Sequence, residues 1–124
     1  MTEEERMRVL VVDDAQDAAQ ALAGLLTLDG HATRVAHDAQ EALRACEMVE
    51  PDCVLIDINL PGMDGLELAR QLRERYGKGI VLVAVTGWGE PEARVSSAFS
   101  DLDHYLRKPV SQEQLRTLLP PQKD

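Results

Sequence analysis

The sequence predicts an α/β fold in which a parallel sheet is covered by helices on both faces. Three observations support this prediction: short uninterrupted apolar runs, helical spacing between those runs, and a length that suits one core. The chain has 124 residues, of which 44% are hydrophobic, so it is long enough for one globular domain and too short for two. We expect a folded domain over residues 8–119, a flexible segment over 1–7 and a tail over 120–124.

Five segments are candidate strands. Three are nearly continuous runs of branched apolar residues, a pattern typical of strands that are buried on both faces of a parallel sheet. These runs cover residues 9–12, 53–56 and 80–85, and the two weaker candidates cover 32–36 and 104–107.

The segments between the candidate strands have the spacing of amphipathic helices. Apolar residues fall on one stripe in each segment, for example Leu66, Ala69 and Leu72, or Val95, Ala98 and Phe99. Three of these helices have a capping residue three positions before a return partner, namely Asp38 with Glu41, Asp64 with Glu67 and Ser111 with Gln114. Strand and helix therefore alternate five times, which favours a parallel sheet with right-handed crossovers.

The composition disfavours several kinds of partner. Lys and Arg number 13 against 22 Asp and Glu, so a net charge of −9 repels nucleic acids and anionic membranes. No apolar run approaches the ~20 residues of a membrane span, and the amino terminus lacks the apolar core of a signal peptide. We therefore expect a cytoplasmic protein that does not bind nucleic acid or membranes directly.

Cysteine and histidine give no sign of a zinc or redox site. Cys46 and Cys53 form no CxxC pair, and His31, His37 and His104 lack the spacing of metal ligands. The two thiols are expected to be reduced and packed in the interior.

Polar side chains stand at the carboxyl end of four candidate strands. The first strand ends in Asp13 and Asp14, the third in Asp57, the fourth in Thr86, and Lys108 follows the fifth. Because ligands of open parallel sheets bind beyond the carboxyl ends of the strands, we expect these groups to converge at one edge.

Three carboxylates at one edge require positive charge, since two like charges ~4 Å apart cost about 4 kcal/mol at an effective dielectric constant near 20. Lys108 and a divalent cation would together neutralise them. Oxygen ligands without Cys or His indicate Mg²⁺. Asp57 is then the best placed nucleophile for a phosphoryl group, because Asp13 and Asp14 form the adjacent pair expected of metal ligands.

Some of these features also have plainer interpretations. Asp14 could cap a helix that begins at Ala15, and Asp57 could close the turn that contains Pro61 and Gly62. Neither interpretation explains why Thr86 and Lys108 fall at the same edge.

The segments VLVVDD, VLIDINLPGMDG, VLVAVTG and YLRKPV, in this order, resemble the response-regulator receiver family over essentially the whole chain. The resemblance implies a single flavodoxin-like, doubly wound (βα)5 domain with strand order 2-1-3-4-5 and a phosphoacceptor role in a two-component phosphorelay. The stretch before Pro109 is also similar to receivers at the carboxyl terminus of hybrid histidine kinases.

The resemblance implies a role for each site residue. Asp13 and Asp14 would position Mg²⁺, Asp57 would accept the phosphoryl group, and the backbone carbonyl of Asn59 would complete the metal shell. In addition, Thr86 and Lys108 would bind the phosphoryl group, Tyr105 would be the switch aromatic, and the Lys108–Pro109 peptide bond would be cis. An aromatic residue near a sheet edge can equally be simple packing, so both interpretations of Tyr105 stay open.

The expected partners also come from the resemblance. A histidine kinase or a histidine phosphotransfer domain would present a phosphohistidine at the acidic edge. An effector, or a second copy of the chain, would bind the face formed by the fourth helix, fifth strand and fifth helix.

Two further positions are notable. Trp88 lies between Gly87 and Gly89, close to Thr86, and we hypothesise that its ring partly covers the site and limits access of water. Asp101 stands where many receivers have glycine, so the turn before the fifth strand is expected to differ.

Three other functions are alternatives. The first is a receiver-like interaction module that is never phosphorylated. The second is a phosphatase of the haloacid dehalogenase type, which needs a DxDx[TV] loop where this chain has Asp13-Asp14-Ala15-Gln16. The third is a flavodoxin-like cofactor binder, which the lack of a Gly- or Ser/Thr-rich loop after Val12 disfavours.

Overall fold

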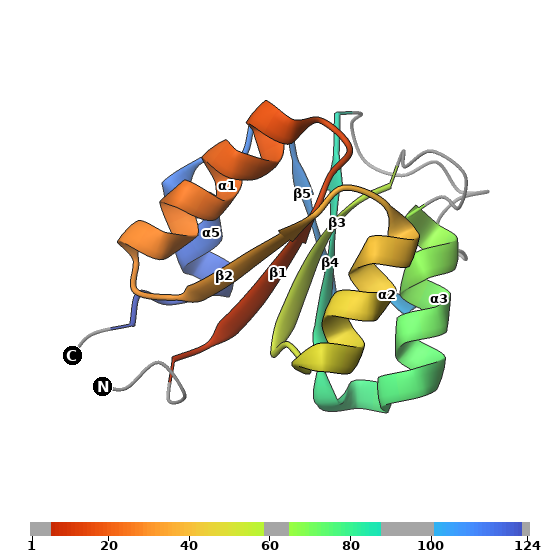
Figure 1. Ribbon diagram of the computed structural model, residues 1–124. Coiled ribbons are helices and arrows are strands. Elements are labelled where there is room, and N and C mark those ends of the chain that lie inside the picture. The colour runs from red at the N-terminus through yellow and green to blue at the C-terminus, as the bar shows by residue number, and fades with distance from the viewer. Residues whose placement is uncertain (1–5, 59–64, 88–100, 123–124) are drawn as a thin grey trace.

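The fold is a five-stranded parallel sheet with helices on both faces, as seen in a computed structural model that describes residues 6–58, 65–87 and 101–122 (Figure 1). The strands are β1 (Arg8–Val12), β2 (Ala32–Ala36), β3 (Cys53–Asp57), β4 (Val81–Thr86) and β5 (His104–Arg107). The helices are α1 (Gln16–Leu28), α2 (Ala39–Met48), α3 (Gly65–Tyr76) and α5 (Gln112–Leu118), with a short 3₁₀ helix η2 (Gly77–Gly79). The α/β prediction is confirmed.

The strand order is β2-β1-β3-β4-β5, and every neighbouring pair is parallel. This order confirms the doubly wound topology. The expected helix around Val95, Ala98 and Phe99 lies outside the described residues, as do Asn59, Asp64 and Trp88.

The strand boundaries differ little from those predicted. The fourth strand begins at Val81, whose N–H donates to the Asp52 carbonyl, one residue later than expected. Ile80 is nevertheless only 1% exposed, because it packs into the core before the strand begins. Ile80 is therefore apolar because it is buried, and not because it belongs to the strand.

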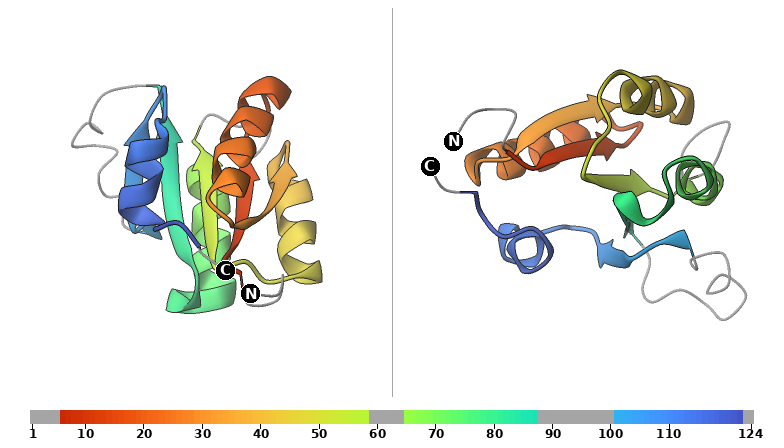
Figure 2. Two further views of the ribbon diagram at one scale, coloured as in Figure 1. Left: turned by 90° about the vertical axis from the view of Figure 1, so that its left-hand side faces the viewer. Right: turned by 90° about the horizontal axis from the view of Figure 1, so that it is seen from below.

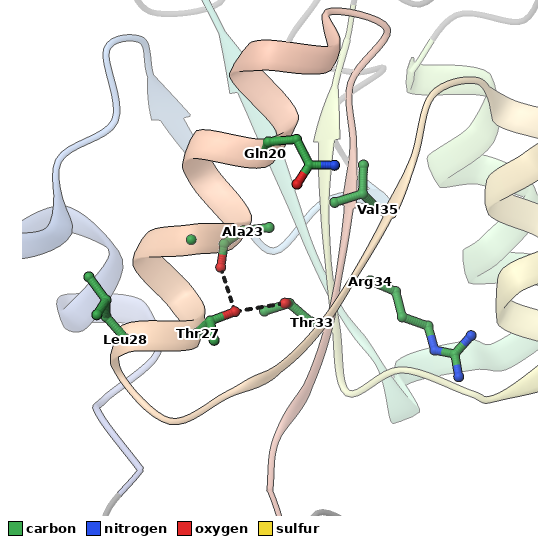
Figure 3. Close-up of a pocket in the computed structure, with 8 residues that line it drawn as sticks. Gln20, Ala23, Thr27, Leu28, Thr33, Arg34 and Val35 are labelled. Atoms are coloured by element: carbon green, nitrogen blue, oxygen red, sulfur yellow. Dashed lines mark hydrogen bonds between the residues drawn. The ribbon is translucent and has the colours of Figure 1, made fainter.

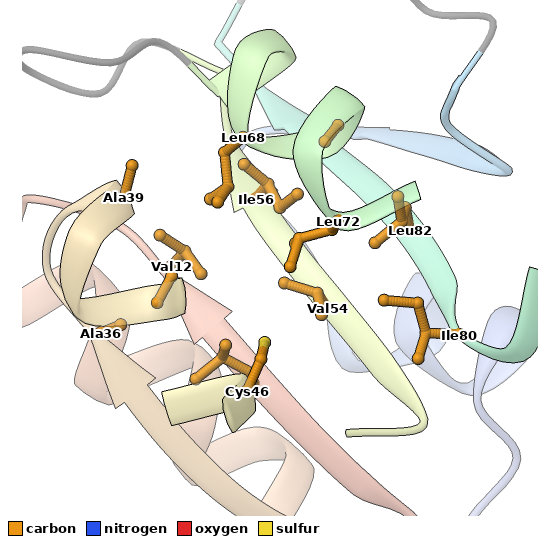
Figure 4. Close-up of a cluster of buried hydrophobic side chains, with 13 residues drawn as sticks. Val12, Ala36, Ala39, Cys46, Val54, Ile56, Leu68, Leu72, Ile80 and Leu82 are labelled. Carbon is orange, nitrogen blue, oxygen red and sulfur yellow. The ribbon is translucent and has the colours of Figure 1, made fainter. Parts of the chain in front are cut away.

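The sheet separates two hydrophobic clusters. One lies under α2 and α3 and includes Val54, Ile56 and Leu72 (Figure 4). The other lies under α1 and α5 and includes Leu55 and Leu26. Figure 2 shows the two helical layers on opposite faces of the sheet. Because alternate residues of β3 enter opposite clusters, the uninterrupted apolar run of this strand is explained.

Local capping fixes where two of the helices begin. The Asp38 carboxylate accepts a hydrogen bond from the Glu41 N–H at 2.7 Å, and Ser111 forms a reciprocal capping box with Gln114. By contrast, the alternative that Asp14 caps the first helix is wrong. The N-cap position of α1 is Ala15, and the Asp13 carboxylate accepts its N–H at 2.9 Å.

The turn before β5 has no left-handed residue. Within the described ranges, no residue other than glycine has a positive φ, so Asp101 adopts an ordinary backbone conformation. Its carbonyl oxygen accepts two hydrogen bonds from the Arg73 guanidinium, at 3.1 and 2.9 Å. These two hydrogen bonds hold the turn against α3.

Candidate functional site: an acidic cluster at the carboxyl edge of the sheet

Three carboxylates meet where β1 and β3 end. One oxygen from each of Asp13, Asp14 and Asp57 lies within 4.8 Å of the others. The strand register explains the convergence, since Val12 of β1 pairs with Ile56 of β3 and the acidic residues follow directly. The edge predicted from strand direction is therefore present.

The three carboxylates have different surroundings. Asp13 and Asp57 are 4% and 6% exposed, whereas Asp14 is exposed to solvent. Burial strengthens electrostatic interactions because water screens them less. A nearby positive charge therefore stabilises the two buried carboxylates most strongly. Asp14 lies on the side of the cluster that faces solvent.

Lys108 provides one positive charge. Its ammonium nitrogen lies 3.3 Å from the Asp13 Oδ2 atom and 3.6 Å from the Asp57 Oδ2 atom, and its side chain is 36% exposed. One ammonium leaves a net negative charge among the three carboxylates. The cluster is thus suited to a further cation.

The dimensions and donors of the cluster fit Mg²⁺. Oxygen ligands ~2.1 Å from this ion can lie up to ~4.2 Å apart across it, and one oxygen of each of the three carboxylates lies within 4.8 Å of the others. Asp13, Asp14 and Asp57 would be its ligands in this part of the structure. The backbone carbonyl of Asn59, the fourth expected ligand, lies outside the described residues.

Thr86 is placed beside Asp57 by the sheet. Asp57 pairs with Val85 in the register of β3 and β4, and Thr86 is the next residue of β4. Thr86 is 2% exposed, and its carbonyl accepts the Lys108 N–H at 2.7 Å. The hydroxyl-bearing residue and the lysine are therefore joined through the main chain.

The segment after β5 turns back toward the cluster. The Lys108–Pro109 peptide bond is cis.

Tyr105, the second residue of β5, is 46% exposed and lies on the surface. Trp88 lies outside the described residues, and its suggested covering role stays a prediction.

Gly65, which begins α3, makes a close approach to the end of β3. A Cβ atom at this position would lie 2.5 Å from the Asp57 carbonyl oxygen and 2.5 Å from the Ile58 Cα atom. Only a residue without a side chain fits there. This constraint is not visible in the sequence, because it arises from packing between two elements.

His37 is a second residue that the sequence analysis missed. It directly follows β2, and its Nδ1 atom lies 3.3 Å from the Asp13 carbonyl oxygen. Its position directly after a strand is the signal for it in the sequence, because β2 ends at the same edge as the acidic strands.

A surface groove lies elsewhere, between α1 and β2. Figure 3 shows the Thr27 hydroxyl bridging the Ala23 carbonyl and the Thr33 hydroxyl within this groove. The residues that line it include no Asp or Glu. The acidic chemistry of the chain is therefore not located in this groove.

The described part of the chain contains no helix with the length and apolarity that a bilayer crossing requires.

Comparisons with known proteins identify the family of this chain. The family model for the response regulator receiver domain matches residues 9–120. The response regulator MprA of Mycobacterium avium is 36% identical over 109 residues, which cover 88% of this chain and 47% of that protein. The chain thus spans about half the length of the curated relatives it matches.

Solved structures of receiver domains are also similar. A CheY-like receiver domain from Methylobacillus flagellatus has a TM-score of 0.81 and 32% identity, with coverage of 93% of this chain and 97% of that chain. The Thermotoga maritima response regulator TrrA, in complex with Mg²⁺ and BeF, has a TM-score of 0.80 and 27% identity, with coverage of 91% and 96%. Together with the match over residues 9–120, these similarities show that the chain belongs to the response regulator receiver domain family.

Proposed function

We propose that the acidic cluster accepts a phosphoryl group on Asp57 and that Asp13, Asp14 and Asp57 hold the Mg²⁺ ion this reaction requires. The observation that carries the proposal is the convergence of three carboxylates within 4.8 Å around a single ammonium group. The Mg²⁺–BeF complex of the related TrrA supports the choice of ion and of chemistry. The Asn59 carbonyl is proposed as a further ligand.

Asp57 is the proposed nucleophile. An oxygen of its carboxylate forms a bond to phosphorus while the bond between phosphorus and the donor imidazole nitrogen breaks, and the electron pair stays on that nitrogen. The product is an aspartyl phosphate. When bound, Mg²⁺ neutralises charge on the phosphoryl oxygens.

Lys108 and Thr86 stabilise the transferred group. Lys108 Nζ is 3.6 Å from the Asp57 carboxylate and can turn from Asp13 toward the phosphoryl oxygens. Thr86, on the neighbouring strand, contributes a hydroxyl donor. The positive charge therefore lies beside Asp57 before the reaction, where it can stabilise the charge of the transferred group.

The phosphoryl group then changes the partner-binding surface. Its charge competes for Lys108 and for the Thr86 hydroxyl, and this shifts an existing equilibrium between two arrangements of β4 and Tyr105. The chain acts as a signalling domain that promotes its own phosphorylation and dephosphorylation and does not turn over a separate substrate. Its proposed donors are a histidine kinase or a histidine phosphotransfer domain, and an effector or a second copy would bind the face around β5 and α5. A cytoplasmic location stays a prediction.

The test is incubation with acetyl phosphate and Mg²⁺, followed by intact-mass measurement. The parent protein should gain the mass of one phosphoryl group, and Asp57→Asn should not. Asp17→Asn, which changes an exposed carboxylate in the first turn of α1, is the matched control and should behave as the parent does. A mass gain that survives in Asp57→Asn contradicts the assignment.

A further inference from the structure

The end of β2 holds the main chain of Asp13 on both sides. The Asp13 N–H donates to the Ala36 carbonyl at 3.0 Å, and the Asp13 carbonyl oxygen lies 3.3 Å from His37 Nδ1. Ala36 and His37 are consecutive residues. The N–H and the carbonyl of Asp13 are thus both held by two consecutive residues, the last residue of β2 and the one that follows it.

The chemistry of the two atoms fixes the direction of the second contact. A carbonyl oxygen can only accept a hydrogen bond, so the His37 Nδ1 atom must carry a hydrogen to make it. In the neutral ring, the Nε2 atom then has the free lone pair. The contact therefore requires one of the two imidazole tautomers.

The side chain of Asp13 is oriented by different partners. Its Oδ1 atom accepts the Ala15 N–H at 2.9 Å, and its Oδ2 atom lies 3.3 Å from Lys108 Nζ. Every polar group of Asp13 thus has a contact, and the contact to its carbonyl oxygen is with His37. Removal of the imidazole would free the carbonyl while the carboxylate kept its partners.

We propose that His37 is a positioning residue for the metal site, acting through the main chain of Asp13 without touching the ion. This inference rests on the proposed function, since it takes Asp13 as a Mg²⁺ ligand. Partners of metal ligands orient those ligands and are a recognised determinant of affinity. By holding the Asp13 carbonyl, the His37 ring keeps the adjacent carboxylate pair within reach of Asp57.

The experiment compares Mg²⁺ binding by the parent, His37→Phe and His37→Gln, with amide chemical shifts followed by NMR during MgCl₂ titration. His37→Phe keeps a ring and removes the donor, so the dissociation constant should rise roughly threefold to tenfold, the worth of one hydrogen bond. His37→Gln keeps an N–H donor and should weaken binding less. The matched control is His104→Phe, at an exposed position that begins β5, and it should bind as the parent does.

A second measurement needs no variant. In the parent at a pH where the ring is neutral, ¹H–¹⁵N couplings should show the His37 proton on Nδ1. A proton on Nε2 overturns the inference, as does unchanged Mg²⁺ affinity in His37→Phe. If the parent itself bound no Mg²⁺, the metal part of the proposed function would fail and this inference with it, whereas unchanged affinity in the variant would remove the inference alone.

Discussion

The Lys108 ammonium lies 3.3 Å from the Asp13 carboxylate although 95 positions separate the two residues in the chain. Asp13 is 4% exposed and the Lys108 side chain is 36% exposed, so water screens this ion pair only in part. The lysine occupies part of the charge-balancing role that we assign to Mg²⁺. If the proposed function holds, lysine and metal would compete in the resting state and cooperate once a phosphoryl group is present.

This competition predicts opposite effects of Lys108→Met on two measurements. Without the ammonium, the three carboxylates should bind Mg²⁺ more tightly, by up to about tenfold, because one repulsive cation is gone. Phosphorylation of Asp57 by acetyl phosphate should nevertheless slow by about 100-fold or more, because a charge that stabilises the transferred group is missing. Lys78→Met, in η2, is the control. Weaker Mg²⁺ binding in Lys108→Met would show that the lysine organises the site and does not compete with the ion.

Gly65 and Gly24 predict opposite results for the same substitution. In Gly65→Ala the new methyl group would lie 2.5 Å from the Asp57 carbonyl oxygen, so the backbone must shift, at a cost of about 1–3 kcal/mol in the free energy of unfolding. In Gly24→Ala, within α1, no atom lies within 4 Å of the new Cβ, and alanine should stabilise the helix by about 0.5–1 kcal/mol.

Urea denaturation of both variants measures these changes. The backbone shift in Gly65→Ala should also weaken Mg²⁺ binding, because residue 65 lies directly against the end of β3 that positions Asp57. Equal stability changes at the two glycines would mean that the start of α3 moves away without cost.

Arg73 and Arg70 both lie on α3, but the Arg73 side chain is largely buried and the Arg70 side chain is exposed. The Arg73 guanidinium donates to the carbonyls of Asp101, Gly77 and Ile80 and to the Asp103 carboxylate, and its side chain is 17% exposed. Loss of these bonds in Arg73→Met should lower the free energy of unfolding by about 2–3 kcal/mol. Arg70 pairs with Glu67 and Glu74 at 53% exposure, where water screens the charges, so Arg70→Met should cost much less stability than Arg73→Met. Thermal unfolding of the two variants checks the difference, and a similar loss in both would refute it.

The α/β class and the acidic edge were predictable because both depend on short-range patterns and strand direction, whereas the strand order followed from the family resemblance. The run 53–56 is apolar throughout because β3 is buried on both faces, and in parallel strands the carboxyl ends share an edge. Asp57, Thr86 and Lys108 could therefore be placed together without coordinates.

Contacts between elements distant in the sequence could not be predicted in this way. The role of Gly65 depends on how closely α3 packs on β3. The hydrogen bond from Arg73 to the Asp101 carbonyl depends on the path of the chain just before β5. The alternative that Asp14 caps α1 is wrong for a related reason. The geometry of the β1–α1 loop places the Asp13 carboxylate, and not that of Asp14, at the Ala15 N–H.

The ion pair between Asp29 and Arg116 predicts how stability depends on pH. Hydrogen bonds from the Arg116 guanidinium lower the pKa of Asp29 below its usual value of 3.8 and outweigh the opposing effect of burial. A lowered folded-state pKa contributes stability that is present above the unfolded value and is lost as the pH falls through the folded value. The pair should therefore stabilise the fold at neutral pH and lose this contribution below about pH 4.

Asp29→Asn tests this dependence. The variant should unfold at a lower urea concentration than the parent at pH 7, and the difference should shrink as the pH falls below 3.8. Arg116→Gln should show the same convergence, and the double variant should be little worse than either single one, because each removes the same pair. The Asp29 carbonyl also accepts the Gln122 N–H at 2.6 Å, and this main-chain bond needs no carboxylate. Additive losses in the double variant would show that Asp29 and Arg116 stabilise the fold through separate contacts.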